Sequence, residues 1–570
     1  MIHTNKTACS YLLALVKKRF SERAFSSQPL MKHPMSEGND IMRNKKPRVF
    51  MATANQINLT ASEQNLKDFL LDVVQMYDNQ ENPKEKLILR FAGGWVRDKL
   101  LGIPSNDIDV AINSLTGSSF TKQVHNYLSN QKNLERHSLN ATDIGRCYKT
   151  AANPEKSKHL ETSTMTIMGY DIDFVNLRKE TYSTESRNPI MEFGTPEEDA
   201  LRRDCTINAL FYNIHTDQVE DFTGGLNDLQ AGCIKTPVDP KITFLDDPLR
   251  ILRLIRFANR LNFFIDPACE SSIRDPDVIS AFHRKITRER VQVEVFKMIK
   301  GNNPRGAFMT FDRLGLYHTV FATAGNKDSP TPNIINWRYA YYCAHELISN
   351  SFFSKALIQS ESETVWLLTA YAPWSRVKQQ AGLSNKSSLA LGAEAARLAL
   401  KVENKKMNLI SGCIKNYDEI IRLKESILRG DEMVSQRDTV GSLIRNWDSS
   451  GGNWRLQVVF AILAEAMDTC KYPISDTAHN QFDENFSAWR KFVDHLEGMK
   501  IMDATLIKNI TNGKALREAL GLKSGKWVGP VLEFCMNWTL RNPDAVDGTE
   551  VIEEVKRRRD ELGIPPSSPQ

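Results

Sequence analysis

The sequence lacks three features that would place it in other classes of protein: a membrane-length apolar run, paired cysteines and a strong excess of charge. Every apolar run is shorter than the roughly 20 residues that a membrane-spanning helix needs, so we expect no membrane insertion. The nine cysteines are scattered without a Cys-x-x-Cys pair, which predicts reduced thiols in an intracellular protein rather than a disulfide framework or a structural zinc site. The net charge of +5 permits an acidic partner such as nucleic acid but does not require one.

The composition that is present is typical of a globular protein with several domains. Hydrophobic residues make up 41% of the chain and charged residues 25%, as in ordinary soluble proteins. A chain of 570 residues is too long for one hydrophobic core, so two to four domains are expected.

The first thirty residues differ from the rest of the chain. They hold one acidic residue, Glu22, and a set of basic ones: Lys6, Lys17, Lys18, Arg19 and Arg23. Apolar residues at positions 11–16 can gather on one side of a helix. A basic, acid-poor, serine-containing N-terminus predicts a mitochondrial presequence, and a merely disordered tail is the alternative.

Methionines downstream of the first one offer further start sites. Met31, Met35 and Met51 follow the basic segment, and initiation there would yield forms without the signal. We therefore expect cytoplasmic and nuclear forms beside the mitochondrial one. The basic cluster at 43–48 could serve as a weak nuclear signal.

The apolar patterns predict a small α/β region followed by a long helical region. Thr60 and Glu63 predict a capping box at the start of a helix. Strands are expected at 86–93 and 107–112, a strand or hairpin at 164–178, and helices or helix-to-strand segments at 95–102 and 197–214. From about residue 240 onward the spacings of three and four are almost wholly helical.

Two aspartates interrupt the apolar strand expected at 107–112. Asp107 and Asp109 point to the same face because side chains alternate along a strand. Two adjacent carboxylates repel each other, and a divalent cation resolves that conflict. Carboxylates suit Mg²⁺, which typically takes one or two of them together with substrate phosphates. A solvated strand edge or a helix cap is the structural alternative.

A pair of glycines lies just upstream of these aspartates. Gly93 and Gly94 stand at a strand-to-helix turn, where backbone N–H groups can approach a phosphate and the helix dipole favours negative charge. Arg97, early in that helix, can supply positive charge to a triphosphate. The combined pattern predicts a metal-bound nucleotide held at this turn.

The ordered set of strand, Gly-Gly, Val-Arg-Asp, loop and Asp-x-Asp resembles motif A of the nucleotidyltransferase superfamily. In that superfamily two metal ions activate a 3′-hydroxyl and stabilise the leaving pyrophosphate. The resemblance therefore implies two Mg²⁺ ions at Asp107 and Asp109. It also implies the fold class: α+β, with a small mixed-sheet, polymerase-beta-like head followed by an elongated all-α neck, body and tail.

The segment RRDCTINAL at 202–210 narrows the resemblance. It is similar to motif B of the class II CCA-adding tRNA nucleotidyltransferases and of the bacterial poly(A) polymerases. In that family the motif contacts the ribose of the incoming nucleotide, which implies nucleotide-binding roles for Arg202, Arg203, Asp204 and Asn208. An ordinary charge cluster at a helix end is the alternative. Cys205 replaces the aromatic residue that is commonest in the family, and we expect it to pack inward.

Two further segments extend the resemblance. DFTGGLNDL at 221–229 resembles motif C, the turn that couples head to neck. DDPLRILRLIRFANRL at 246–261 resembles the family's EDxxR motif, with Asp246 in place of glutamate.

Asp247 and Arg250 in this last segment lie three residues apart and share a helix face. An aspartate can accept from the amino group of cytosine or adenine, and an arginine can donate to the neighbouring ring nitrogen. Uracil and guanine present the reverse order, so one pair of side chains would accept CTP and ATP and refuse UTP and GTP. Asp247 before Pro248 is also an ideal helix start, so capping competes with base reading for the same oxygens.

Two other segments, one acidic and one polar, also resemble parts of the family's site, but their motifs are less specific. Asp171 and Asp173 form a second alternating pair, and superfamily members can use a third carboxylate on the neighbouring strand as general base, which makes Asp173 the candidate. A hydrogen-bonded strand aspartate is the alternative. The polar segment 137–162 matches in place the family's flexible loop, which helps the site move from C to A addition.

Near the end of the chain, residues 512–534 resemble the family's tRNA-binding tail. Lys523 and Lys526 could meet phosphate there, and an ordinary helical hairpin is the alternative. No RRM, KH or OB signature is visible, so tRNA shape and backbone are the expected targets.

The resemblance implies five parts: 1–50, a presequence and disordered basic segment; 51–235, the catalytic head; 236–305, the neck that recognises the base; 306–430, the body; and 431–570, the tRNA-binding tail.

The activity implied is that of a CCA tRNA nucleotidyltransferase, which adds C, C and A to tRNA from CTP and ATP without a nucleic-acid template. In that reaction the 3′-hydroxyl attacks the α-phosphate and pyrophosphate leaves. A poly(A) polymerase of the same class, or a non-catalytic RNA-binding protein that retains the fold, are the alternatives.

Overall fold

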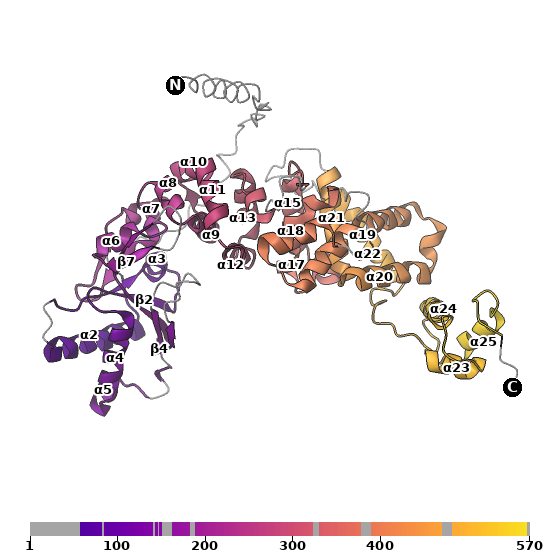
Figure 1. The fold of residues 1–570 in the computed structure, drawn as a ribbon, viewed down its shortest axis with the longest axis horizontal. Helices are drawn as coiled ribbons and strands as arrows, with labels where there is room; N and C mark the ends of the chain where they lie inside the picture. Colours follow the sequence, from indigo (N-terminus) through magenta and orange to yellow (C-terminus); the bar gives the residue numbers. More distant parts are fainter. Residues whose placement is uncertain are drawn as a thin grey trace, which may run out of the picture. The chain divides into compact units, whose positions relative to one another are not determined.

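The structure, a computed structural model, describes most of the chain from residue 57 onward (Figure 1). The described ranges are 57–81, 85–140, 143–145, 148–150, 162–182, 189–322, 330–377, 389–469 and 482–566. The expected presequence, the downstream methionines, the basic cluster at 43–48 and much of the loop at 137–162 lie outside these residues. Within the described helices, none combines the length and the apolar character that a membrane span requires.

A seven-stranded mixed sheet organises the head, in the order β3-β4-β5-β2-β1-β8-β9. Its strands are β1 (Leu89–Ala92), β2 (Asp107–Ile112), β3 (Tyr148–Thr150), β4 (Thr162–Ile167), β5 (Tyr170–Asn176), β8 (Leu210–Asn213) and β9 (Gln218–Asp221). β2 pairs antiparallel with β1 and parallel with β5. The strand that carries the aspartates is therefore internal to the sheet, which excludes a solvated edge strand.

The two faces of the sheet differ because side chains alternate along each strand. Ile108, Val110 and Ile112 are buried in the main hydrophobic core. Ala111 lies on the opposite face, in a small separate cluster that includes Ala92 and Phe211. Asp107 and Asp109 share that second face.

Helix α2 (Ala61–Glu81) helps to cover the core face, and it begins as expected. The backbone N–H of Thr60 donates to Glu63 at 2.7 Å, and the backbone N–H of Glu63 donates to the Thr60 hydroxyl at 3.3 Å. This capping box satisfies two N–H groups at the helix start. α4 (Gly117–Leu128) packs on β5 and is followed by α5 (Gln131–Arg136).

The remaining head elements include the segment 202–210, which resembles motif B. α3 (Gly94–Leu100) follows β1 directly, and α6 (Pro196–Leu201), the 3-10 turn η4 (Thr206–Asn208) and α7 (Gly225–Ala231) flank β8 and β9. Asp221 accepts the backbone N–H groups of Thr223, Gly225 and Leu226, so it caps α7. The segment expected as one helix running into a strand is thus divided by η4. A small separate sheet of β6 (Arg178–Thr181) and β7 (Ile190–Phe193) also stands beside α6.

The neck begins with two helices that are separated at Asp247 and Pro248, where the sequence predicted a helix start. α8 (Pro240–Asp246) ends before Asp247, whose backbone is extended with φ −131° and ψ 93°, and α9 (Leu249–Leu261) starts after Pro248. β10 (Cys233–Ile234) and β11 (Phe264–Ile265) pair in parallel and connect the end of the head with the end of α9. This short sheet is the exception to the helical pattern expected beyond residue 240.

The rest of the described chain is helical (Figure 1). The neck and body helices are α10 (Pro267–Ile273), α11 (Pro276–Lys285), α12 (Arg288–Ile299), α13 (Pro304–Arg313), α14 (Tyr317–Phe321), α15 (Trp337–Ser349), α16 (Ser351–Phe353), the π-turn η5 (Ser354–Ile358), α17 (Ser362–Tyr371), the 3-10 turn η6 (Ala372–Arg376), α18 (Leu391–Leu400) and α19 (Asn404–Arg429). They are followed by η7 (Glu432–Ser435), α20 (Arg437–Gly451), α21 (Trp454–Thr469) and α22 (Asp483–Gly498).

The last three described helices have a core of their own. α23 (Gly513–Leu520), α24 (Val528–Arg541) and α25 (Thr549–Arg557) bury a cluster that includes Leu516, Trp527 and Val551. The six described cysteines are buried and form no disulfide with one another: Cys205, Cys233, Cys269, Cys343, Cys413 and Cys535.

Substitution of Gly117 by alanine tests the packing of α4 on the strand next to the aspartates. A Cβ at Gly117 would lie 2.0 Å from the carbonyl oxygen of Phe174 in β5, so backbone must move. We expect a loss of roughly 1–3 kcal/mol of unfolding free energy, as for other overpacked sites. The control is Gly529→Ala in α24, where nothing lies within 4 Å of the added carbon. Thermal unfolding should show a lower midpoint for Gly117→Ala only; equal midpoints would contradict the packing.

Candidate nucleotide-binding and catalytic site

A cavity of about 560 Å³ between the head sheet and helix α9 brings the expected nucleotide-binding residues together. Its lining includes Gly93, Gly94, Arg97, Asp107, Asp109, Arg202, Arg203, Asp204, Asn208, Asp247 and Arg250. These residues come from four separate stretches of sequence. Its cationic side chains are all arginines, whose planar guanidinium groups suit phosphates and base edges.

Asp107 and Asp109 face this cavity from the internal strand β2. Both are exposed, whereas Ile108 between them is buried. In the parallel pairing of β2 with β5, Asp107 lies opposite Asp171 and Asp109 lies opposite Asp173. Four carboxylates therefore stand in two adjacent rows on one face of the sheet.

The electrostatics of Asp109 fit a cation site. Enclosure by protein raises the pKa of this carboxyl above its ordinary value; Arg203 opposes the rise, and the neighbouring carboxylates of Asp173 and Asp107 add to it. A hard divalent cation would relieve this repulsion. No group of three or more His, Cys, Asp or Glu side chains in the described part of the chain forms a complete metal site. Two protein carboxylates plus nucleotide phosphates match the usual coordination of Mg²⁺.

Asp173 is held by the neighbouring strand. The Thr164 hydroxyl of β4 donates to Asp173 Oδ1 at 2.5 Å, and the Thr166 hydroxyl donates to Asp171 Oδ1 at 2.8 Å. Asp173 does not line the cavity itself. Its role as general base stays a prediction, and the hydrogen bond from Thr164 fits the structural alternative as well.

Gly93 occupies a position that requires glycine. Its φ of +69° is strained for other residues, and an added Cβ would lie 2.8 Å from Arg203 Nη1 and 3.6 Å from Asp109 Oδ2. The backbone of this turn thus passes between the carboxylate and the guanidinium. Gly94 is less restricted, because a Cβ there would meet Arg97 Nη2 at an ordinary 3.6 Å.

Arg97 is engaged with protein groups. Its Nε donates to Asp98 Oδ1 at 2.8 Å, its Nη1 donates to Asn208, and only 2% of the residue is exposed. Asn208 donates in turn to Asp204 Oδ1 at 3.1 Å. Arg97 and Asn208 thereby connect the glycine turn with the second motif.

Asp204 is ionised and paired with the neck. Burial alone would raise its pKa, but Arg253 and the hydrogen bond from Asn208 hold the pKa well below its usual range. Arg253 Nε of α9 donates to Asp204 Oδ2 at 2.6 Å. Cys205 is fully buried beside it, as expected.

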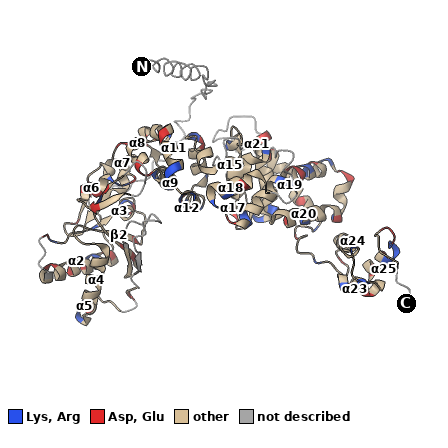
Figure 2. Ribbon diagram, in the orientation of Figure 1, with Lys and Arg blue, Asp and Glu red and all other residues tan. Residues whose placement is uncertain are grey.

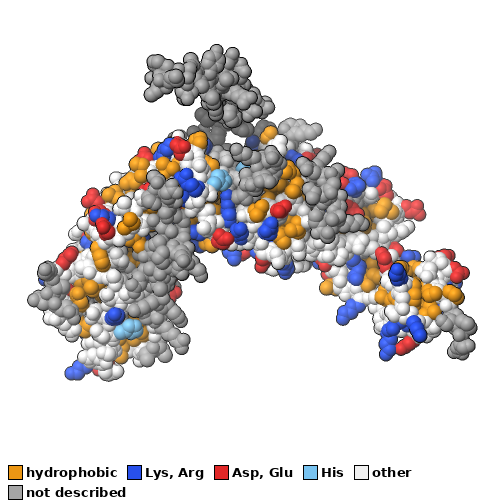
Figure 3. All heavy atoms as spheres, in the orientation of Figure 1, with side chains coloured by type: hydrophobic (Ala, Val, Ile, Leu, Met, Phe, Trp, Pro, Cys, Tyr) orange, Lys and Arg blue, Asp and Glu red, His pale blue; other side chains and the backbone are white. Residues whose placement is uncertain are grey.

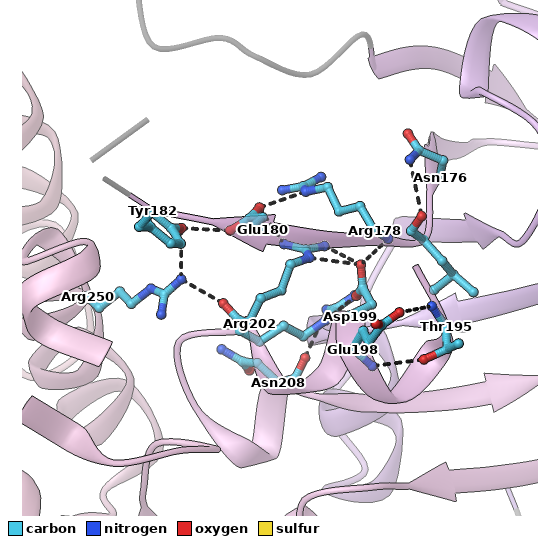
Figure 4. A network of polar contacts seen from close by, with 12 residues as sticks. Asn176, Arg178, Glu180, Tyr182, Thr195, Glu198, Asp199, Arg202, Asn208 and Arg250 are labelled. Atoms are coloured by element: carbon cyan, nitrogen blue, oxygen red, sulfur yellow. Dashed lines mark hydrogen bonds and ion pairs between the residues drawn. The ribbon is translucent and has the colours of Figure 1, made fainter. Parts of the chain in front are cut away.

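Arg202 pairs with Asp199 of α6 (Figure 4), and Arg203 pairs with the same carboxylate. Arg203 also donates to the carbonyl oxygen of Asn208 at 3.0 Å, and Arg202 donates to Glu180 at 3.2 Å. Burial would raise the pKa of Asp199, but the two guanidinium groups hold it below its ordinary value. These contacts hold Arg202 and Arg203, which the sequence predicted to bind ribose, in fixed positions.

Asp247 and Arg250 both line the cavity from the start of α9. Asp247 Oδ1 accepts the backbone N–H of Leu249 at 3.2 Å, so one carboxylate oxygen caps the helix. Among the described residues, Oδ2 has no hydrogen-bond partner. Capping and base reading can therefore use different oxygens of the same carboxylate.

Several site residues were not foreseen from the sequence. Arg253, Phe257 and Arg260 also line the cavity, and Arg260 donates to Asp98 Oδ2 at 3.1 Å. Arg253 and Arg97 lie over the Phe257 ring at 5.6 and 5.4 Å from its centroid. They follow Arg250 at intervals of three and four, and this spacing predicts that they lie on one face of α9. Figure 2 shows basic residues on this helix.

The tail lysines lie apart from this cavity. Lys523 and Lys526 are both exposed in the connection between α23 and α24. The basic run at 556–559 is partly neutralised, because Arg557 and Arg558 pair with Glu554. On the face in Figure 3, basic, acidic and apolar side chains are mixed over the helical part.

Comparisons with known proteins identify the class. Residues 89–235 match the family described as "Poly A polymerase head domain", and residues 262–324 match "Probable RNA and SrmB- binding site of polymerase A". The chain is 43% identical to the nucleotidyltransferase lcsQ of Purpureocillium lilacinum, over 91% of this chain and 95% of the relative. The cavity and the matched head thus define a nucleotidyltransferase.

A second relative narrows the class. The mitochondrial CCA tRNA nucleotidyltransferase of Saccharomyces cerevisiae is 34% identical, over 89% of this chain and 95% of the relative. The chain belongs to the tRNA nucleotidyltransferase family, whose members generally use a divalent metal ion. An apo structure of a CCA-adding enzyme has the same fold, with a TM-score of 0.60 and 20% identity over 88% of this chain and 96% of that one.

The pair between Arg253 and Asp204 can be tested by a double-mutant cycle. Arg253→Met would leave a buried carboxylate without its cation, and we expect a loss of about 1–3 kcal/mol of unfolding free energy, reduced by the partial exposure of Arg253. Adding Asp204→Asn should restore part of this loss. Arg422→Met, which breaks an exposed pair with Asp418, is the control and should change stability by less than about 0.5 kcal/mol. Strictly additive effects of the two site substitutions would show that the pair is not coupled.

Proposed function

We propose that the chain is a CCA tRNA nucleotidyltransferase that adds C, C and A stepwise to the 3′ end of tRNA from CTP and ATP without a nucleic-acid template. The observation that carries this proposal is the convergence of two residue pairs on one cavity. Asp107 and Asp109 of the head supply a metal-binding pair, and Asp247 and Arg250 of the neck supply a base-reading pair. A triphosphate between them would have its phosphates at the first pair and its base at the second.

In the proposed reaction the tRNA 3′-oxygen attacks the α-phosphorus, the bond to the β-phosphate oxygen breaks, and pyrophosphate leaves. Two bound Mg²⁺ ions, held by Asp107 and Asp109, would supply charge neutralisation and a more acidic 3′-hydroxyl. Backbone N–H groups at the start of α3, beside Gly93 and Gly94, orient the triphosphate. Asp173, opposite Asp109 in the sheet, is the candidate to receive the hydroxyl proton through the oxygen that Thr164 does not occupy.

In this proposal the wall of the cavity that faces the ribose consists of Arg202, Arg203, Asp204 and Asn208. Their mutual hydrogen bonds fix the wall before nucleotide arrives, which lowers the entropy lost on binding. Arg97 has two roles in this proposal. It holds Asp98 and Asn208 in place by donating hydrogen bonds to them, and its positive charge lies near the triphosphate.

The division of the chain into head (51–235), neck (236–305), body (306–430) and tail (431–570) fits this mechanism. The head holds the metal-binding pair, and the neck holds the base-reading pair. We propose that the tail binds the outer part of tRNA, with Lys523 and Lys526 exposed for contact with phosphate.

We further propose a mitochondrial location, with cytoplasmic and nuclear forms from downstream start codons. Two relatives, from Saccharomyces cerevisiae and Candida glabrata, are named as mitochondrial CCA tRNA nucleotidyltransferases. The basic N-terminus of this chain fits the same location.

A nucleotide-addition assay separates the proposal from its alternatives. Purified protein is incubated with a tRNA that lacks its 3′ CCA, with CTP alone, ATP alone or both. A CCA-adding enzyme adds two nucleotides from CTP alone and a third when ATP is present. A long tail from ATP alone would identify a poly(A) polymerase, and RNA binding without any addition would identify a non-catalytic protein.

Asp107→Asn should abolish addition of both nucleotides while tRNA binding stays largely intact. The substitution removes one metal-binding charge and keeps the side-chain size. Asp171→Asn is the matched control, because Asp171 lies opposite Asp107 in the adjacent strand and is bound by Thr166. Single-turnover addition and tRNA binding by gel shift measure the two effects. Equal activity of Asp107→Asn and Asp171→Asn would remove Asp107 from the metal site.

Arg250→Ala should reduce nucleotide selection more than RNA affinity. Removal of the guanidinium leaves no donor for the ring nitrogen of cytosine or adenine, so the ratio of kcat/KM for CTP over UTP should fall by at least about tenfold. Unchanged discrimination against UTP would remove the base-reading assignment.

Chelation should stop the reaction reversibly. EDTA in excess over divalent cations should abolish addition, and an excess of Mg²⁺ should restore it, because Arg203, whose charge acts on Asp109, is already held by Asp199 and the carbonyl oxygen of Asn208. Thermal unfolding in EDTA controls for loss of fold. Full activity in EDTA would exclude the proposed metal dependence.

A further inference from the structure

Tyr182 lies in the wall of the nucleotide cavity, next to the proposed base-reading arginine (Figure 4). It follows strand β6 of the small hairpin. Arg250 Nη2 of α9 donates to the Tyr182 hydroxyl at 3.2 Å, and the Arg250 guanidinium carbon lies 5.8 Å from the centre of the tyrosine ring. The contact therefore joins the head hairpin to the neck helix at the base-reading position.

The direction of the hydrogen bonds at Tyr182 is fixed by Glu180. The hydroxyl donates its single proton to Glu180 Oε2 at 2.7 Å. Burial would raise the pKa of Glu180, but the guanidinium groups of Arg202 and Arg178 hold it below its ordinary value, so the carboxylate is charged and accepts. The phenol oxygen can then only accept from Arg250.

This arrangement determines which edge of Arg250 faces the cavity. Nη2 carries two hydrogens; one is donated to the carbonyl oxygen of Arg202 at 2.7 Å and the other to Tyr182. Nη2 is thus fully used by the protein. Among the described residues, Nε and Nη1 make no hydrogen bond, and Arg250 is only 7% exposed. The Nε and Nη1 hydrogens are the donors left for a ligand.

We propose that Tyr182 is a positioning residue that sets the orientation of Arg250 and thereby the discrimination between nucleotide bases. It acts through its hydroxyl group, not through contact with the base. A guanidinium held at one nitrogen by two acceptors cannot rotate to offer Nη2, or to move aside for a base with the reverse donor and acceptor order. The inference rests on the proposed base reading by Arg250.

The test compares Tyr182→Phe with the unmodified chain and with Arg250→Ala, as the full-length protein. Phenylalanine keeps the ring and removes only the hydroxyl. We expect the ratio of kcat/KM for CTP over UTP to fall about 5- to 10-fold, as for the net loss of one ordinary hydrogen bond, with a higher KM for CTP and little change in kcat. The substrate is a tRNA lacking its 3′ CCA.

Tyr212→Phe is the matched control. The Tyr212 hydroxyl donates to Asp217 at 2.6 Å, and Tyr212 lies outside the cavity lining, so its loss should leave the ratio unchanged. Thermal unfolding of both variants separates a general loss of stability from a change in selection.

A second variant distinguishes the hydroxyl from the ring. Tyr182→Leu removes both, and the inference requires Tyr182→Phe to account for most of its effect on the ratio. If Tyr182→Leu lost discrimination while Tyr182→Phe kept it, the ring would be the active part and the inference would be overturned.

The failure of the inference differs from the failure of the proposed function. Collapse of the ratio in Arg250→Ala together with a normal ratio in Tyr182→Phe would overturn the role of Tyr182 and leave base reading by Arg250 in place. A normal ratio in Arg250→Ala would overturn both.

Discussion

The ion pairs between helix α9 and the head are the interaction on which the rest of the site depends. Arg253 and Arg260 bind Asp204 and Asp98, and Arg250 binds the carbonyl oxygen of Arg202. α9 carries Arg250, with Asp247 just before its start, and these two are the proposed base-reading pair; the head carries Asp107 and Asp109, the proposed metal-binding pair. Because the arginines join these two parts, a single cavity is lined by both pairs. Salt screens the attraction within partly buried ion pairs of this kind less than it screens the attraction within surface pairs.

The same network binds many of the candidate residues to one another. Arg97, Asn208 and Asp204 form a continuous chain of hydrogen bonds, and Asp199 holds both Arg202 and Arg203. Dipoles and charges that are already oriented need little reorganisation when a substrate binds or when charge develops at a phosphate. The unpaired donors and acceptors at the cavity surface then determine what the site can bind. Asp107 and Asp109 face the cavity from the head sheet, and Arg250 faces it from the neck.

Local sequence signals predicted the elements that local forces determine. The capping box at Thr60, the strand of Asp107 and Asp109, and the inward packing of Cys205 are all present. Each depends on residues close in sequence or on a simple alternation of apolar and polar positions. The prediction was incomplete where distant segments pair. The β6–β7 hairpin and the β10–β11 pair depend on contacts that no local pattern encodes.

The sequence by itself indicated the residue types of the site: two carboxylates on one face of a strand, a glycine pair at a strand-to-helix turn, and an aspartate three residues before an arginine at a helix start. Those properties follow from residue type and from the period of strands and helices. Only the tertiary structure decided how the free donors are distributed. The choice of Tyr182, Glu180 and Arg253 as partners depends on where a hairpin and a neck helix meet the sheet, and that meeting is fixed by packing between segments far apart in the chain.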